Sequence, residues 1–371
     1  MENEKNVSAL QKEEIIPDSR SAASDGKKQK KKSIPGRIIL AVLGILLLAL
    51  IITGVIIFYG PVSTIMSVTE IDDGIYSMNY NRDYDLDKAL SADIHTEQQL
   101  MSFISDTLFY GLDVGVNQKY IACSAFLTHD GDGSYYAGRN FDYDKTEMLT
   151  VYTTPKDGYA SIAMVPLCGL GIGDTFGQDP MSLLSRAEML AAPYLCTDGM
   201  NEKGVMTSVL NLNSDELHTY SDKPDIITFV AIRMILDRAA SVDEAVEMLS
   251  HYDFHSMTGV AQHLFISDAS GRSVVVEWYK HNMAVIDSPV CTNFWLSSPV
   301  EYAGRCERFD TLTQRLEEKP VNTPEDAMDN LRAANVSWTQ WSCVYHLSDF
   351  SVDIVIKNRY EKVYKVSPDK F

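Results

Sequence analysis

The sequence lacks the short patterns that mark metal and nucleotide sites. None of the six cysteines stands in a C-x-x-C pair and no H-E-x-x-H occurs, so we expect no zinc site. The glycine-rich residues 168–173 fail the G-x-G-x-x-G spacing, because Asp174 stands where the last glycine is needed. We predict a mobile loop there, and neither a metal nor an organic cofactor.

Basic residues are scarce relative to acidic ones. The chain has 32 Lys+Arg against 51 Asp+Glu, a formal net charge of -19. Nucleic-acid binding needs a basic face that neutralises phosphates, so this balance argues against it. The 371 residues suffice for one large domain or two ordinary ones. Six dispersed cysteines in so long a chain do not indicate a disulfide scaffold, although some can pair outside the cytoplasm.

Charge is absent altogether from Ile38 to Tyr59, a run of 22 residues rich in Ile, Leu and Val. At about 1.5 Å per residue a helix of this length reaches roughly 33 Å, enough to span a hydrocarbon core of about 30 Å. The nearest alternative is a cleaved signal peptide, but the run is too long, begins too far into the chain and lacks an A-x-A type site. We predict a transmembrane helix over residues 38–60.

The flanking charges predict the orientation of this span. Residues 1–37 carry 9 Lys+Arg and 6 Asp+Glu and have the composition of a disordered basic tail. Basic residues beside a span favour the cytoplasmic side. We therefore expect a single-pass protein of the cell membrane, with a cytoplasmic N-terminus and an extracytoplasmic remainder.

Residues 61–122 are predicted to be a pro-segment or linker that contains one helix. The sequence TEQQ from Thr96 forms a capping box, and the helix runs to about Tyr110, before Gly111. Its apolar stripe would allow a pro-segment to dock on the domain that it precedes. An ordinary stalk that contains a helix is the alternative.

The next stretch, CSAFLTHDGDGSYYAGRNFDYD, begins at Cys123 and predicts a β-hairpin. Two β-prone runs flank the turn residues 129–133. The hairpin returns the chain to its start, so Arg139 and Asp142 can lie beside Cys123. A thiol, a guanidinium and a carboxylate together can hold a thiolate at neutral pH. From the hairpin alone, a buried core cysteine is the commoner case.

The rest of the chain alternates strand and helix patterns, which is compatible with an α+β fold. The predicted strands are residues 149–153, 161–165, 205–213, 264–267, 273–278, 344–347 and 354–357. The predicted helices are residues 226–238, 241–249, one that opens at 305–309 and one that begins at Thr323.

Several motifs resemble the choloylglycine hydrolase (linear amide C–N hydrolase) family, which includes bile salt hydrolases and penicillin V acylases. They are Cys123 followed by GRNFD at 138–142, DGMNEKG at 198–204 with L-N ending the next strand, S-D-x-x-G with V-V-E at 267–277, T-N at 292–293 and TQWSC at 339–343. The resemblance implies that residues 123–371 form the four-layer αββα sandwich of N-terminal nucleophile (Ntn) hydrolases.

The resemblance also implies a nucleophile. In that family the initial cysteine becomes N-terminal by self-cleavage, so Cys123 would attack the substrate. Its own α-amine would be the base, with an ordinary pKa of about 7.7–8.0. Arg139 would favour the thiolate and Asp142 would orient the amine.

Three further residues would complete the site by resemblance. Asn211, chiefly through its backbone N–H, and Asn293, through its side chain, would bind the oxyanion. Arg308, in the sequence Arg308-Phe309, would complete the polar cluster, with Arg305 as a neighbour that could take its place.

We therefore expect hydrolysis of a linear, non-peptide amide bond in an N-acyl amino acid or related N-acyl amide, through a Cys123 acyl-enzyme. The expected partner is this small-molecule substrate. By resemblance, residues 174–193 form a longer segment than in typical bile salt hydrolases, so the identity of the substrate stays open. Two alternatives also stay open: an acyltransferase with an amine acceptor, and a membrane-tethered binding protein on an inactive hydrolase scaffold.

Overall fold

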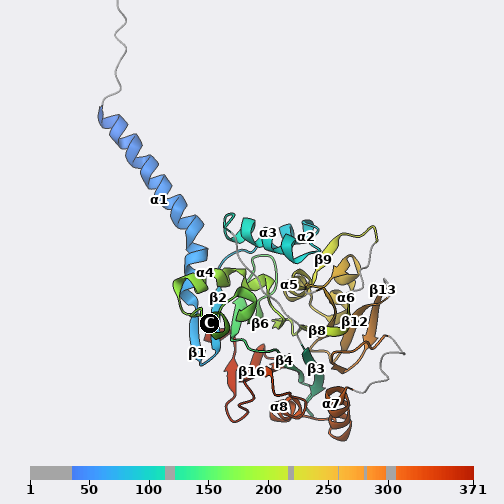
Figure 1. Ribbon diagram of the computed structural model, residues 1–371. Coiled ribbons are helices and arrows are strands. Elements are labelled where there is room, and N and C mark those ends of the chain that lie inside the picture. Colours follow the sequence, from blue (N-terminus) through green and yellow to red (C-terminus); the bar gives the residue numbers. More distant parts are fainter. Residues whose placement is uncertain (1–35, 113–121, 216–220, 258, 280–281, 298–305) are drawn as a thin grey trace, which may run out of the picture. The chain divides into compact units, whose positions relative to one another are not determined.

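The computed structural model describes residues 36–112, 122–215, 221–257, 259–279, 282–297 and 306–371 (Figure 1). The chain divides into two units, Met1–Gly54 and Val55–Phe371. The described residues of the first unit belong to helix α1 (Gly36–Ser67), which contains the predicted span 38–60 and continues to Ser67. This helix is long and apolar enough to cross a membrane.

Two β-sheets form the centre of the second unit. In the described residues, the larger sheet has the strand order β1-β2-β5-β6-β7-β8-β11-β12-β13 and the smaller has the order β14-β3-β4-β15-β16-β17. The larger comprises β1 (Thr69–Asp72), β2 (Ile75–Tyr80), β5 (Met148–Thr153), β6 (Ser161–Pro166), β7 (Asp198–Asn201), β8 (Met206–Asp215), β11 (Val260–Ser267), β12 (Ser273–Tyr279) and β13 (Asn282–Asp287). The smaller comprises β3 (Ala122–His129), β4 (Tyr135–Asp142), β14 (Val290–Cys291), β15 (Thr339–His346), β16 (Ser351–Ile356) and β17 (Tyr364–Val366), and β9 (Asp225–Ile227) pairs separately with β10 (Asp253–His255).

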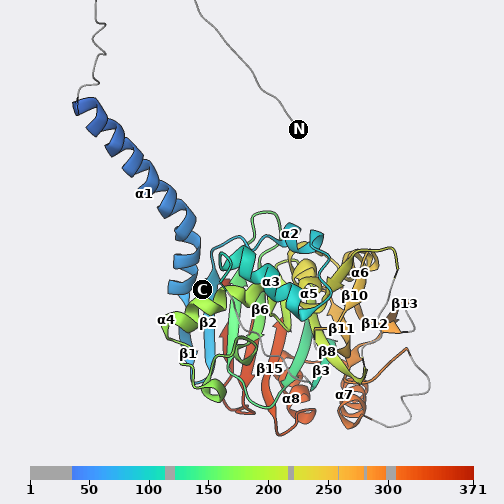
Figure 2. The ribbon, with the colours of Figure 1, turned by 45° about the horizontal axis from the view of Figure 1, so that its top comes forward.

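Helices lie on the outer sides of these sheets (Figures 1 and 2). The helices beside the larger sheet are α2 (Leu86–Ser91), α3 (Glu97–Leu108), α5 (Thr228–Arg238) and α6 (Val242–Ser250), with the short α4 (Leu183–Glu188) nearer β1 and β2. Those beside the smaller sheet are α7 (Glu307–Glu318) and α8 (Pro324–Ala333). The capping box predicted at Thr96 is confirmed, and the helix predicted to begin at Thr323 also starts with one, since each threonine side chain accepts a backbone N–H of the first helical turn.

Side-chain alternation along the strands directs neighbouring residues into different apolar cores. On β12, Val274 and Val276 pack toward α5 and α6, whereas Val275 packs in the core shared by the two sheets. On β3, Cys123 points into this shared core, while Phe126 packs with the α7 and α8 side chains. Successive side chains of a strand point to opposite faces, so Cys123 and Phe126, three positions apart, lie on opposite faces of β3. The thiol of Cys123 is on the face between the sheets.

The structure adds elements that local patterns did not reveal in residues 61–122. Strands β1 and β2 and helix α2 precede the predicted helix, and β2 pairs with β5 in parallel from Ile75 opposite Met148 to Tyr80 opposite Thr153. A parallel pair needs a long crossover between its strands, so local sequence patterns do not predict it.

The glycine-rich residues 168–173, predicted as a mobile loop, include part of a buried 3₁₀ turn, Leu167–Leu170. The motif at 198–204 begins as strand β7, Asp198–Asn201, and a turn follows it before β8.

Candidate active site

The β3–β4 hairpin brings the first three predicted site residues together, as its sequence predicted. Cys123 lies opposite Phe141, Ala122 opposite Asp142, and Ala125 opposite Arg139. The side chains of Cys123 and Arg139 are fully buried, and Asp142 is almost so. Strand β15 on the other side of β4 adds Thr339 opposite Asp142.

The main chain of Cys123 is held by side chains from two distant parts of the sequence. Its N–H donates to Asn293 Oδ1 at 2.7 Å, and its carbonyl oxygen accepts from Arg308 Nη1 at 2.8 Å. Arg308 Nη2 also donates to Asn293 Oδ1, at 2.8 Å. Both polar groups of the Cys123 backbone are therefore held by side chains of predicted site residues.

Asp142 completes this cluster as the ion-pair partner of Arg308. Arg308 Nη1 donates to Asp142 Oδ2 at 2.7 Å, and Thr339 Oγ1 donates to Oδ1 at 2.6 Å. Burial raises the pKa of Asp142 above its usual value, while the Thr339 hydrogen bond and the Arg308 charge oppose that rise. Arg308 makes these contacts, and Arg305 lies outside the described residues.

Arg139 crosses from the smaller sheet to the larger one. Its Nη1 donates to its neighbour's carbonyl, Asn140 O, at 2.7 Å, and its Nη2 donates to Val209 O on β8 at 3.0 Å. Asp198 on β7 supplies the opposite charge, with Oδ1 3.7 Å from Arg139 Nε. Arg139 is therefore a buried cation between the sheets, on the same core face as Cys123.

The thiol itself differs from the expectation of a thiolate at neutral pH. With the Ala122–Cys123 bond intact, complete burial raises the pKa of Cys123 to about 11, and the Arg139 charge only partly offsets this. The reason is that a buried thiolate loses its hydration, which sequence reasoning did not weigh against the nearby cation. In the intact chain Cys123 is a neutral thiol near pH 7.

The two predicted oxyanion residues also meet. Asn293 Nδ2 donates to the backbone oxygen of Asn211 at 2.6 Å. Gln262 Nε2 donates to Asn211 Oδ1 at 2.7 Å, and Gln262 Oε1 in turn accepts from Thr228 Oγ1. Within the described chain, Asn211 Nδ2 has no hydrogen-bond partner and is buried.

Sequence reasoning missed the residues that hold the cluster from behind. Thr339, Asp198 and Gln262 contact Asp142, Arg139 and Asn211 respectively. Thr339 and Asp198 each stand in a motif that resembled the family, which was the available signal, whereas Gln262 stood in no such motif.

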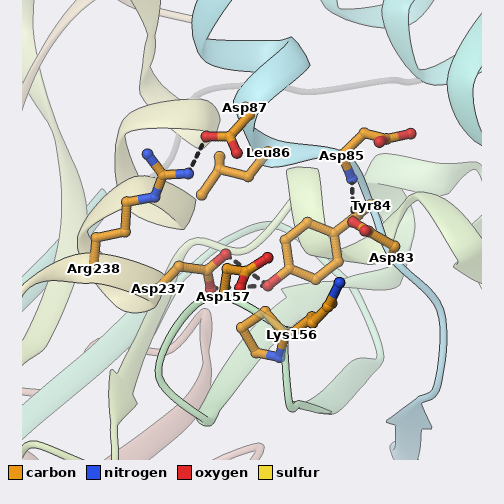
Figure 3. A pocket seen from close by; sticks show the side chains of 10 residues that line it. Asp83, Tyr84, Asp85, Leu86, Asp87, Lys156, Asp157, Asp237 and Arg238 are labelled. Atoms are coloured by element: carbon orange, nitrogen blue, oxygen red, sulfur yellow. Dashed lines mark hydrogen bonds and ion pairs between the residues drawn. The ribbon is translucent and has the colours of Figure 1, made fainter.

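A pocket elsewhere in the second unit contains none of the predicted site residues. Figure 3 shows it beside α2 and the end of α5, with five carboxylates, Lys156 and Arg238 among its lining. Asp237 there accepts from Tyr84 Oη, and Arg238 pairs with Asp87. No group of three His, Cys, Asp or Glu side chains in the described part of the chain has an arrangement that could hold a metal ion.

Comparison with known proteins bears on the hairpin and the residues after it. A family model for "Linear amide C-N hydrolases, choloylglycine hydrolase family" matches residues 123–294. The matched segment belongs to the choloylglycine hydrolase family. It begins at Cys123 and ends just after Asn293, so it includes every predicted site residue except Arg308.

Curated relatives of the choloylglycine hydrolase family match parts of the chain. A penicillin V acylase from Pectobacterium atrosepticum is 34% identical over 93 residues, which are 22% of this chain and 25% of that protein. A bile salt hydrolase/transferase from Clostridium perfringens is 24% identical over 183 residues, 45% of this chain and 51% of that protein. The chain thus spans between a quarter and about half the length of these relatives.

Solved structures of the same family are similar at lower identity. A variant of the conjugated bile acid hydrolase from Clostridium perfringens is 16% identical with a TM-score of 0.49, covering 67% of this chain and 93% of that one. The penicillin V acylase from Agrobacterium tumefaciens is 18% identical with a TM-score of 0.46, covering 67% and 87%.

Proposed function

We propose that this protein is a membrane-tethered amidase that cleaves itself before Cys123 and then hydrolyses a linear amide in an N-acyl amino acid or related N-acyl amide. One observation carries the proposal: the Cys123 nitrogen, which would become the α-amine, is already held by Asn293 Oδ1. Arg308 links Asn293, the Cys123 carbonyl and Asp142 around it.

The fold assigned with this function is the four-layer αββα sandwich of Ntn hydrolases. Two observations support it: the two sheets share one apolar core, and each sheet packs its other face against helices. Cys123 at the start of β3, in the shared core, then occupies the place that an N-terminal nucleophile needs.

Self-cleavage would proceed by transfer of an acyl group from nitrogen to sulfur. Cys123 Sγ attacks the carbonyl carbon of Ala122, the C–N bond between Ala122 and Cys123 breaks, and the thiol proton passes to the departing nitrogen. Water then attacks the thioester, its hydroxyl forming the Ala122 carboxylic acid, which ionises to solvent, and its other proton returning to sulfur. The first step thus frees the α-amine of Cys123, and water is the only other reactant.

Substrate hydrolysis would use the released amine. The α-amine accepts the Cys123 thiol proton as sulfur attacks the substrate carbonyl, and passes it to the leaving amine. Asn293 Nδ2 and the Asn211 backbone N–H would stabilise the developing oxyanion, since fixed neutral donors act without reorganising. Water then hydrolyses the acyl thioester and restores the thiol.

The domain organisation follows from the same proposal. Residues 1–37 would be cytoplasmic, 38–60 would span the membrane, and 123–371 would be the extracytoplasmic catalytic part. Residues 61–122 would stay bound after cleavage, because β2 pairs with β5 and fully buried side chains of this segment enter the core beside α5. Burying a side chain such as Met78 or Leu100 stabilises the association by about 1.5–3 kcal/mol each.

The test combines processing with turnover in the full-length protein. Active protein should yield the amino-terminal sequence Cys-Ser-Ala-Phe, and Cys123→Ala should stay uncut and fail to hydrolyse a panel of N-acyl amino acids. Cys196→Ala is the matched control and should behave as wild type, because Cys196 is also a buried cysteine but lies in the core beside α5, where its thiol donates to Pro193 O. Turnover in Cys123→Ala would refute the proposed function.

An acyltransferase is the second candidate, because the Clostridium perfringens relative is a "bile salt hydrolase/transferase". Adding amine acceptors to the same panel separates the two reactions by product mass. A protein that binds panel members but turns none over would be a binding protein instead.

A further inference from the structure

Asn293 lies on a short irregular segment, residues 291–297, whose placement decides where its amide points. The segment begins at the end of β14, where Cys291 pairs with Ala125 of β3. Asn293 itself contacts Asn211, Cys123 and Arg308, which are the residues that it is proposed to serve. This segment must keep its position while negative charge develops on the substrate oxygen.

A buried line of three side chains fixes the beginning of this segment. Cys291 Sγ lies 3.4 Å from His263 Nε2, and His263 Nδ1 lies 3.1 Å from Glu277 Oε1. All three side chains are fully buried. With Nδ1–H donated to the carboxylate, Nε2 is left to accept from the thiol, so a neutral imidazole satisfies both partners.

The same carboxylate fixes the end of the segment. Glu277 Oε1 accepts from Leu296 N and Oε2 accepts from Ser297 N, each at 2.8 Å. Burial favours the neutral acid, but the His263 and backbone hydrogen bonds outweigh it and lower the pKa of Glu277. Glu277 is therefore an anion near pH 7 that accepts from three donors.

Both contacts originate on one rigid support. His263 is on β11 and Glu277 on β12, and these strands pair along Leu264–Ser267 and Ser273–Val276. The β11–β12 pair thus holds the 291–297 segment at its first residue and at its last two, with Asn293 between these points.

We propose that Glu277 and His263 are positioning residues that hold the 291–297 segment so that the Asn293 amide stays in place to stabilise the oxyanion. This rests on the proposed function, because it names what orients a donor of that site. Loss of one oxyanion donor lowers kcat by about 10²–10³-fold, and a misplacement of about 1 Å can cost roughly 10²-fold. A loosened segment should therefore lower kcat by about 10- to 100-fold.

Glu277→Gln tests this, with Asp268→Asn as the matched control. Asp268 is also a buried carboxylate of the β11–β12 hairpin that accepts two backbone N–H groups, from Val242 and Ser270, but it contacts no residue of the 291–297 segment. We expect Glu277→Gln to lower kcat by about 10- to 100-fold with little change in KM, since oxyanion donors act in the transition state. Asp268→Asn should leave both constants near wild type.

Hydrogen exchange supplies a readout that does not need turnover. In the full-length protein the Leu296 and Ser297 amides should exchange faster in Glu277→Gln and stay protected in Asp268→Asn. If Glu277→Gln does not fold, His263→Gln is tested instead, with the same expected changes. Unchanged exchange at these amides, or an equal loss of kcat in the control, would overturn the inference. A wild-type protein without amidase activity would refute the proposed function, and the exchange result alone would then decide whether Glu277 holds the segment.

Discussion

Replacing Arg308 by Met should destabilise the protein by leaving Asp142 buried without its counter-ion. Removing one partner of a buried pair costs about 3–5 kcal/mol. The Arg308 side chain keeps 18% of its surface exposed while that of Asp142 is fully covered, so water screens part of the pair. We therefore expect the lower end, about 3 kcal/mol, which lowers Tm by roughly 4–5 °C for the second unit, Val55–Phe371.

The pH dependence of this loss follows from the pKa of Asp142. Its pKa in the folded state is already above the usual value, and loss of the Arg308 charge should raise it further. A carboxyl group whose pKa is raised in the folded state contributes its full folding stability below its unfolded pKa of about 3.9, and this stability is lost as pH rises through the folded pKa. The deficit of Arg308→Met should thus be small near pH 4 and largest near pH 7.

A second substitution separates stability from catalysis. Arg308→Met with Asp142→Asn removes both charges and keeps an acceptor for Thr339, so Tm near pH 7 should recover most of the loss. Hydrolysis should not recover. Thermal unfolding in detergent measures both variants, with Arg315→Met as the control, an exposed arginine of the same helix. A double variant as unstable as Arg308→Met would refute this reasoning.

Three further predictions concern the thiols, the maturation and the topology. In the uncut chain, an alkylating reagent near pH 7.5 should modify Cys306 first, because it alone of the six cysteines is not buried. Mass mapping that finds Cys123 modified first would contradict this burial. Self-cleavage should accelerate about tenfold per pH unit between roughly pH 7 and 9, since the pKa of Cys123 is raised to about 11 and the thiolate fraction grows with pH. Time courses of cleavage after cell-free synthesis measure this, and a rate that does not change with pH would exclude thiolate attack. Protease added to intact cells should digest residues beyond about 60 and spare an amino-terminal tag, and the reverse pattern would invert the orientation.

Local signals were enough to predict the hairpin of the candidate site. The turn residues 129–133 between two β-prone runs set the pairing of β3 with β4, and that pairing carries Cys123, Arg139 and Asp142 to one place. The helix caps at Thr96 and Thr323 were also readable, because a cap depends on residues three positions apart.

Contacts between distant residues were beyond such signals. Arg308 reaches Asp142 and Cys123 across more than 160 residues, and only the resemblance to the family indicated it. The raised pKa of Cys123 depends on how completely two sheets enclose the thiol, which no motif states. The His263–Glu277 pair joins neighbouring strands at positions that read simply as strand residues.

The parallel pairing of β2 with β5 gives the proposed cut an unusual consequence. The connection between these strands, residues 81–147, contains the Ala122–Cys123 bond, so cleavage opens a crossover and leaves the pairing itself in place. The sheet would then be assembled from two polypeptides, as in a split protein whose halves complement each other. Residues 1–122 and 123–371, made as separate chains in one cell, should accordingly rebuild the enzyme, and its catalytic half should reach the membrane through its partner's strand.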